Sequence, residues 1–113
     1  MLRRPHRLVQ EKDFQLIYKY GRTSISRLII LRFLKNNKGK SRFGFIVGNK
    51  ISKKSTLRNR IKRYLREIVR NNLKQIKSGY DYILIARQAI IGKKYREIKQ
   101  EIDKLFIKSG QIT

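Results

Sequence analysis

The segment from Lys50 to Arg70, KISKKSTLRNRIKRYLREIVR, limits the possible folds of this chain more than any other. At about 100° per residue, its apolar side chains fall on one side of a helix, and they are Leu57, Ile61, Tyr64, Leu65 and Ile68. This spacing is typical of a helix that packs one face on a protein core. The rest of the chain must therefore supply the layer on which this helix lies.

Cations occupy the adjoining side of the same helix. The polar residues that gather there are Arg58, Asn59, Lys62, Arg63, Arg66 and Arg70. Arg60 falls beyond the opposite edge of the apolar stripe, and Glu67 is the only acid of the segment. Exposed helix faces usually mix both signs of charge, so this excess of cations favours contact with nucleic-acid phosphates over a merely solvated surface.

The charge of the whole chain agrees with this interpretation. Thirty Lys and Arg residues stand against seven Asp and Glu residues, which gives a net charge of +23 over 113 residues. A compact domain that basic repels itself unless a polyanion supplies counter-charge. The length suits a single domain, and 40% hydrophobic residues is too many for a disordered basic tail. We therefore expect one RNA-binding domain over residues 1–113.

The composition also indicates in which cellular compartment the protein is located. The chain has no cysteine, which excludes disulfides and thiolate metal sites and suits an intracellular protein. No apolar run approaches the roughly 20 residues of a membrane span, and the N-terminus has no hydrophobic signal core. We expect a soluble cytoplasmic protein without membrane contact.

Apolar periodicity predicts the other elements. Residues 1–10 should form a flexible basic arm, in which His6 has no partner with which to share a metal. We expect helices over 11–20, closed by Gly21, and over 95–106. Strands are predicted over 28–34, 42–49 and 80–87, with 22–26 a polar connection that can include a short edge strand.

The connections predict how the strands pair. A turn-rich loop between 28–34 and 42–49 predicts an antiparallel hairpin. The strand over 42–49, the basic helix and the strand over 80–87 form a crossover unit, so these two strands should run parallel in a mixed sheet covered by helices. Gly44 and Gly48 would admit close packing or the close approach of a ligand, and packing is the favoured interpretation.

The first helix carries Phe14, Ile17 and Tyr18 on one face. Ile17 fits a core position. The two aromatic residues fit the core and a stacking platform for unpaired bases equally well, because aromatic rings beside cations serve either purpose.

The carboxylates do not form a catalytic pattern. None of the seven, alone or in pairs, resembles a two-metal site or a base beside a nucleophile, and no glycine-rich phosphate loop is present. We therefore predict no catalytic residues and no metal ligands on the polypeptide.

The motif RNRIKRYLRE, residues 58–67, resembles the protein subunit of bacterial ribonuclease P. RLVQEKDFQLIYKYG is similar to that family's first helix, GFIVGNK to its strand before the motif, and DYILIAR to its last strand. The resemblance covers nearly the entire chain.

This resemblance implies an α/β domain of the α+β two-layer kind, with the element order αβββαβα. Its sheet is mixed and mostly antiparallel, as in the second domain of ribosomal protein S5, and the crossover through the basic helix is left-handed, against the usual rule. The implied partners are a catalytic RNA and precursor tRNA, whose 5′ leader the particle removes, without an obligate protein partner. Mg²⁺ would be held mainly by the RNA.

The resemblance also implies two sets of binding residues. The catalytic RNA would contact the basic helix and its preceding loop through Lys50, Lys53, Lys54, Arg58, Asn59, Arg60, Lys62, Arg63 and Arg66. The single-stranded 5′ leader would lie in a cleft between the first helix and the sheet, at Phe14, Tyr18 and Arg32. Arg32 stands where the family often has an aromatic residue, and Asn49-Lys50-Ile51 replaces a frequent lysine pair.

Other functions remain open from the residues alone. A small basic ribosomal protein with a structural role would share this composition and is the main alternative. An autonomous nuclease is disfavoured because no catalytic pattern is present, and DNA binding is not excluded by a basic helix.

Overall fold

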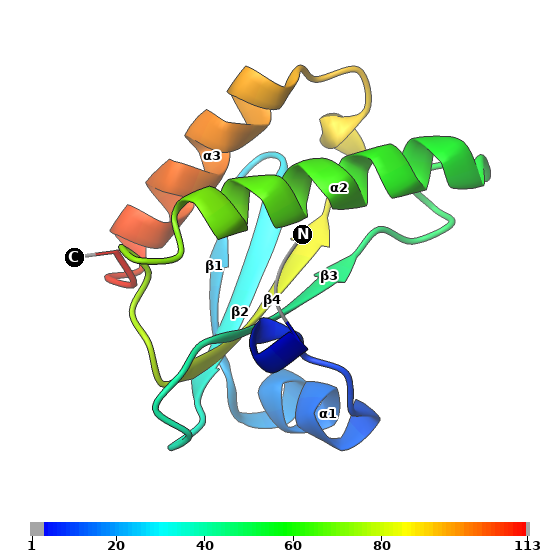
Figure 1. Cartoon of the computed structure of the whole chain (residues 1–113). Helices are drawn as coiled ribbons and strands as arrows, with labels where there is room; N and C mark the ends of the chain where they lie inside the picture. The colour runs from blue at the N-terminus through cyan, green and yellow to red at the C-terminus, as the bar shows by residue number, and fades with distance from the viewer. Residues whose placement is uncertain (1–3, 113) are drawn as a thin grey trace.

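The computed structural model describes residues 4–112, which form a four-stranded sheet with three α-helices packed on it (Figure 1). The elements in chain order are η1 (Arg4–His6), α1 (Glu11–Tyr20), β1 (Arg22–Ile25), β2 (Ile29–Lys35), β3 (Arg42–Ile46), α2 (Ser55–Asn71), β4 (Tyr80–Ala86), η2 (Gln88–Ile90) and α3 (Tyr95–Lys108). This order confirms αβββαβα. Within the described part of the chain, no helix combines the length and the apolarity that crossing a membrane requires.

The strand order in the sheet is β1-β2-β4-β3. β2 pairs antiparallel with β1 and β4, whereas β3 pairs parallel with β4. The mixed, mostly antiparallel sheet and the parallel pair are thus confirmed. The predicted hairpin of β2 and β3 is wrong, because β4 lies between them. Four consecutive β4 residues, Asp81 to Leu84, are buried, so this strand requires neighbours on both edges.

The crossover from β3 through α2 to β4 is left-handed. Seen with α2 in front of the sheet and both strands pointing up the page, β4 lies to the left of β3 (Figure 1). Most connections of this kind are right-handed, so the sense implied by the family resemblance is the one observed.

The two faces of the sheet carry separate cores because side chains alternate along each strand. On one face, α2 and α3 cover a large cluster centred on Tyr82, whose ring stacks on Phe43 at a centroid distance of 5.1 Å and lies 5.4 Å from Phe106. On the other face, α1 covers a smaller cluster around Ile17 and Ile83, both fully buried. The core position predicted for Ile17 is confirmed.

The predicted basic arm is partly docked on the sheet. Leu8 is buried, and its N–H donates to the carbonyl oxygen of Phe43 on β3 at 2.9 Å. His6 Nδ1 lies 2.7 Å from the carbonyl oxygen of Ser41. These contacts hold the segment against the edge strand, so it does not extend away from the domain. Residues 1–3 of the predicted arm lie outside the described residues.

Candidate nucleic-acid interface

Helix α2 is oriented by its apolar stripe. Ile61, Leu65, Ile68 and Val69 are almost completely buried against the sheet and α3. All five predicted stripe residues are buried or half-buried, and Val69, which was not predicted, joins them. Because this side is fixed to the core, the cationic side of α2 must face outward.

The outward side of α2 forms a cationic groove, defined here by Asn59, Arg63, Arg66, Glu67 and Arg70. Its volume is about 430 Å³. Glu67 is the only acid among the described residues that line it, so the field at its surface is strongly positive. The structure therefore brings together three of the predicted RNA-binding residues, Asn59, Arg63 and Arg66.

Arg58 has a different local role. It is half-buried, and its Nη1 donates to the carbonyl oxygen of Ser52 at 2.9 Å, which ties the loop before α2 to the helix. That loop carries Lys50, Lys53 and Lys54, all exposed. The loop cations thus adjoin the N-terminal end of α2, as predicted, while Arg58 braces their backbone.

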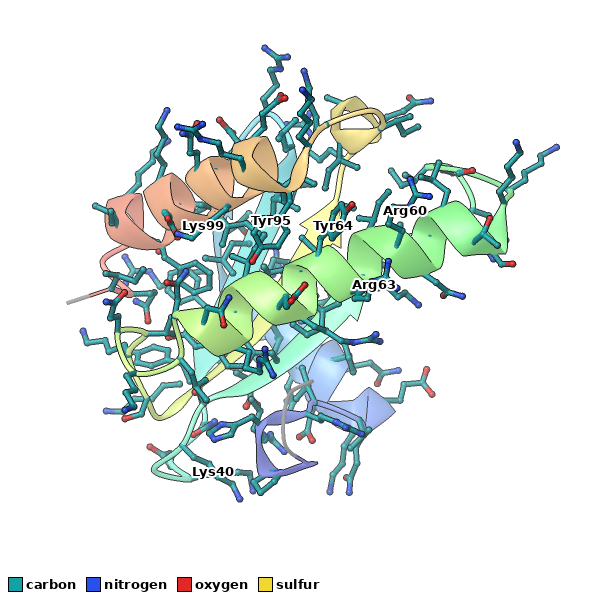
Figure 2. All side chains as sticks on the ribbon, turned by 45° about the horizontal axis from the view of Figure 1, so that its top comes forward. Lys40, Arg60, Arg63, Tyr64, Tyr95 and Lys99 are labelled. Carbon is teal, nitrogen blue, oxygen red and sulfur yellow. The ribbon has the colours of Figure 1, made fainter. Side chains whose placement is uncertain are left out.

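Arg60 and Lys62 do not line the cationic groove. Arg60 is on the side of α2 that faces α3, close to Tyr64 and Tyr95 (Figure 2). This placement agrees with the prediction that Arg60 points away from the other cations. Lys62 is half-buried, and it does not line the cationic groove.

A second hollow, the β3 cleft, lies between α1 and the edge of the sheet. It is lined by Arg7, Leu8, Val9, Phe14, Phe43, Gly44, Phe45 and Arg66 and has a volume of about 300 Å³. Phe14 packs directly on Gly44, where an added Cβ atom would lie 2.6 Å from two carbons of the ring. The predicted close packing is confirmed at Gly44, because any larger residue would push Phe14 out of place. At Gly48 it is wrong, since an added Cβ atom there meets nothing within 4 Å.

Of the predicted binding residues, only Phe14 and Arg66 line this cleft. Leu8, Val9 and the β3 residues were missed. The signal that could have found the β3 residues is the small Gly44 between two aromatic residues of one strand. Leu8 and Val9 give no comparable signal, since their position depends on the docking of the arm.

Tyr18 and Arg32 form a pair one helical turn beyond Phe14. The guanidinium carbon of Arg32 lies 5.8 Å from the centroid of the Tyr18 ring. Burial raises the pKa of the Tyr18 phenol, against a smaller opposite effect of Arg32. Neither residue lines the β3 cleft, but Tyr18 shares one side of α1 with Phe14, four residues earlier.

Most donors of Arg32 are already used inside the fold. Its Nη2 donates to the carbonyl oxygens of Ile17 at 3.0 Å, Tyr18 at 2.6 Å and, weakly, Gly21 at 3.4 Å, and its Nη1 donates to Thr23 Oγ1 at 2.6 Å. The last carbonyls of a helix lack partners in the next turn. Arg32 therefore caps the end of α1 and holds the backbone that carries Tyr18.

A partly buried ionic network anchors the start of α1. Arg42 donates from Nε and Nη2 to the two carboxylate oxygens of Asp81, at 2.8 and 2.6 Å, and from Nη1 to Asp13 at 3.3 Å. The hydrogen bond to Asp81 is the main reason why the pKa of Arg42 is raised, against the opposite effect of burial. Because Asp13 belongs to α1 and the other two to the sheet, this network helps to set the orientation of α1 beside the β3 cleft.

The described side chains contain no cluster of typical metal ligands. Between residues 4 and 112 no three His, Cys, Asp or Glu side chains are grouped closely enough to hold one. Near the two hollows, Asp13 and Asp81 form ion pairs with Arg42. Glu67 is surrounded by the arginines of the cationic groove.

Comparison with known proteins gives independent evidence for the family of this chain. A profile of the family described as Ribonuclease P matches residues 2–110. The ribonuclease P protein component of Synechocystis sp. is 36% identical over 107 residues, which cover 94% of this chain and 86% of that protein. The component of Symbiobacterium thermophilum is 36% identical over 110 residues, covering 96% and 95%. The solved RNase P protein of Staphylococcus aureus matches with a TM-score of 0.89 at 28% identity, covering 96% of this chain and 98% of that one.

Proposed function

The chain belongs to the family of bacterial ribonuclease P protein components, and on this premise we propose that it binds both the catalytic RNA and the precursor tRNA of that ribonucleoprotein. The particle removes the 5′ leader from precursor tRNA. In this proposal the protein raises the affinity for substrate and lowers the Mg²⁺ requirement, while the RNA performs the cleavage.

The catalytic RNA would lie on α2 and its preceding loop. The residues assigned to this contact are Lys50, Lys53, Lys54, Arg58, Asn59, Arg60, Lys62, Arg63 and Arg66. The buried stripe of α2 supports the assignment, since it fixes the helix backbone, so that only the cationic side chains have to be ordered when RNA binds. Arg58 contributes indirectly as well, by bracing the lysine loop.

The 5′ leader would lie in the β3 cleft and continue along α1. The observation that carries this proposal is that Arg66 lines both the cationic groove and the β3 cleft. A strand of RNA leaving the cationic groove would therefore pass Arg66 on its way to Phe14. A ring in such a place can stack on an unpaired base with little sequence preference.

Tyr18 and Arg32 would extend the leader contact by one helical turn. Tyr18 is 45% exposed, so its ring is accessible to a base. Arg32 would affect leader binding mainly by holding Tyr18 in place. Its described hydrogen bonds go to the protein, and its guanidinium group lies over the Tyr18 ring. We therefore assign Arg32 a positioning role beside the direct contact with the leader that is expected for it.

We propose that Mg²⁺ in this system is held by the RNA. Mg²⁺ prefers oxygen ligands and commonly binds phosphates, which the RNA supplies in large number. The protein's own contribution is to screen phosphates, whose mutual repulsion otherwise demands a higher concentration of divalent cations.

The decisive experiment measures binding of precursor tRNA and of mature tRNA to the reconstituted particle over a range of salt concentrations. Wild-type particles should bind the precursor more tightly, because only the precursor carries a leader. Phe14→Leu should reduce this preference by about five-fold, since it removes a stacking contact of about 1 kcal/mol. It retains an apolar side chain against Gly44, so the fold is preserved.

Leu16→Ala is the matched control, because Leu16 is exposed on α1 and does not line the β3 cleft. It should leave the preference unchanged. Equal affinities for the two tRNAs in the wild-type particle would refute leader binding. Precursor cleavage by the RNA-free polypeptide would refute the assignment of chemistry to the RNA.

The alternative of a structural ribosomal protein is not favoured, because the family profile and the relatives are ribonuclease P proteins. That alternative would require co-sedimentation with ribosomal subunits and no stimulation of cleavage at low Mg²⁺.

A further inference from the structure

A third hollow lies on the other side of α2 from the β3 cleft. It is enclosed by the first half of α2 and by the turn that joins η2 to α3, and its volume is about 320 Å³. We name it the Arg60 groove and define it by Arg60, Tyr64, Lys93, Lys94 and Tyr95, above a floor that includes Ile61 and Ile90. In Figure 2 the labelled Tyr64 and Tyr95 lie between α2 and α3, and Arg60 lies farther along α2, toward the segment that follows β4.

The floor of the Arg60 groove is apolar and aromatic. Ile61 and Ile90 are almost completely buried. Tyr64 and Tyr95 meet edge to face, with ring centroids 5.5 Å apart and planes at 87°, and both remain half-buried. Because the two rings brace each other across α2 and α3, they present a preorganised surface rather than two mobile side chains.

The rim of the groove is cationic. Arg60 and Lys94 are exposed, and Lys93 is half-buried. No carboxylate occurs among the described residues that line it. The nearest described ion pair joins Lys93 to Glu97 at 3.9 Å, which is long and exposed on the Glu97 side, and it neutralises little of the rim. The rim therefore suits a phosphate.

The size, the floor and the rim of the Arg60 groove together indicate which ligand it would bind. A volume of this size is at the lower end of the range for small-molecule sites, which fits one nucleotide rather than a helix of RNA. An aromatic floor suits a base, and a rim of three cations suits its phosphates. Ile91, 42% exposed beside the groove, adds apolar surface that a base could cover.

We propose that the Arg60 groove binds an unpaired nucleotide of the catalytic RNA, so that this RNA contacts α2 from both sides. The inference rests on the proposed function and extends it to Tyr64, Lys93, Lys94 and Tyr95, which that function does not use. It also explains why Arg60 points away from Arg63 and Arg66: it contacts a different segment of the same RNA.

The first test uses the absence of cysteine from the chain. A single cysteine introduced as Ile91→Cys, carrying an iron chelate that generates hydroxyl radicals, should cut the catalytic RNA at a discrete segment in the assembled particle. Ile107→Cys is the matched control, because Ile107 is also an exposed isoleucine, at 63%, but lies at the far end of α3. Cutting from Ile91→Cys no stronger than from Ile107→Cys would overturn the proposal.

The second test measures the salt dependence of binding to the catalytic RNA alone. Lys93→Gln with Lys94→Gln should lower the slope of log affinity against log salt by about 0.7 for each single-strand phosphate that is no longer neutralised. Lys104→Gln with Lys108→Gln removes the same charge from the opposite end of α3 and should leave the slope nearly unchanged.

These outcomes separate the two proposals. If the wild-type protein binds the RNA steeply with salt but both lysine pairs give the same slope, the Arg60 groove does not bind RNA and the proposed function stands. If the wild-type protein does not bind the catalytic RNA, the proposed function fails first. Melting temperatures of all variants should match the wild type, since the altered side chains are at the surface and no core residue changes.

Discussion

Replacement of Gly44 by alanine tests how the β3 cleft is built. An alanine Cβ would lie 2.6 Å from two ring carbons of Phe14. Ordinary contacts between carbon atoms are about 3.5–4.0 Å, so the ring must retreat by about 1 Å. Phe14 is half-buried and belongs to α1, so the ring, the helix or both must move.

The expected cost of Gly44→Ala is modest but measurable. Overpacking of this kind costs about 1–3 kcal/mol, and the half-exposed ring can yield, which favours the lower part of that range. The loss of backbone freedom in the unfolded state offsets about 0.4–1 kcal/mol. A net destabilisation of about 1 kcal/mol should lower the melting temperature by about 4 °C.

The assay is urea and thermal unfolding of the free protein, combined with precursor tRNA binding by the reconstituted particle. Gly48→Ala is the control, because a Cβ atom there meets no atom within 4 Å and its stability should stay within about 0.5 kcal/mol of wild type. Displacement of the Phe14 ring should also reduce the preference for precursor over mature tRNA.

A double-mutant cycle tests whether contact with Phe14 causes the cost of Gly44→Ala. In a Phe14→Ala background the added methyl group has no ring to displace, so Gly44→Ala should be neutral or slightly stabilising there, and the two changes should couple by about 1–2 kcal/mol. Additive effects, or a neutral Gly44→Ala in the wild-type background, would show that contact with Phe14 does not account for the glycine.

Two further predictions concern buried polar groups. Asp81→Asn should destabilise the protein by about 3 kcal/mol in urea unfolding, because it leaves the buried charge of Arg42 poorly paired. Asp103→Asn, which breaks a half-exposed pair, should cost about 1 kcal/mol or less. Burial raises the pKa of Tyr82 above its ordinary value near 10. The unfolded chain therefore loses this proton first, and the stability advantage of wild type over Tyr82→Phe should shrink as pH rises from about 9 to 11. A stability difference between wild type and Tyr82→Phe that does not change with pH would contradict the raised pKa of Tyr82. Equal destabilisation by Asp81→Asn and Asp103→Asn would contradict the expectation that the more buried ion pair costs more to break.

Much of the fold was predictable from local patterns. The bounds of α1 and the register of the α2 stripe follow from spacing along the chain, because side chains three and four residues apart share a helix face in any surroundings. For the same reason the separation of Arg60 from Arg63 and Arg66 was predictable from angles alone. The complete αβββαβα order with β1 as a definite strand, the left-handed crossover, and the division of the expected binding residues between two RNAs came instead from the family resemblance.

The pairing of strands was not predictable in the same way. Proximity along the chain favoured a hairpin of β2 and β3, but the burial of β4 on both faces placed it between them. Whether two strands are neighbours depends on which one best fills the sheet interior, and that competition involves residues more than thirty positions apart.

The order of residues alone was enough to establish a core-fixed helix with an almost purely cationic outer side, since charge and helical period require no tertiary context. Three other features arose only when the elements packed together: Arg66 borders two hollows, Phe14 rests on Gly44, and Arg32 uses its donors to cap the end of α1. Each of these depends on distances between elements, which the packing of the whole domain sets.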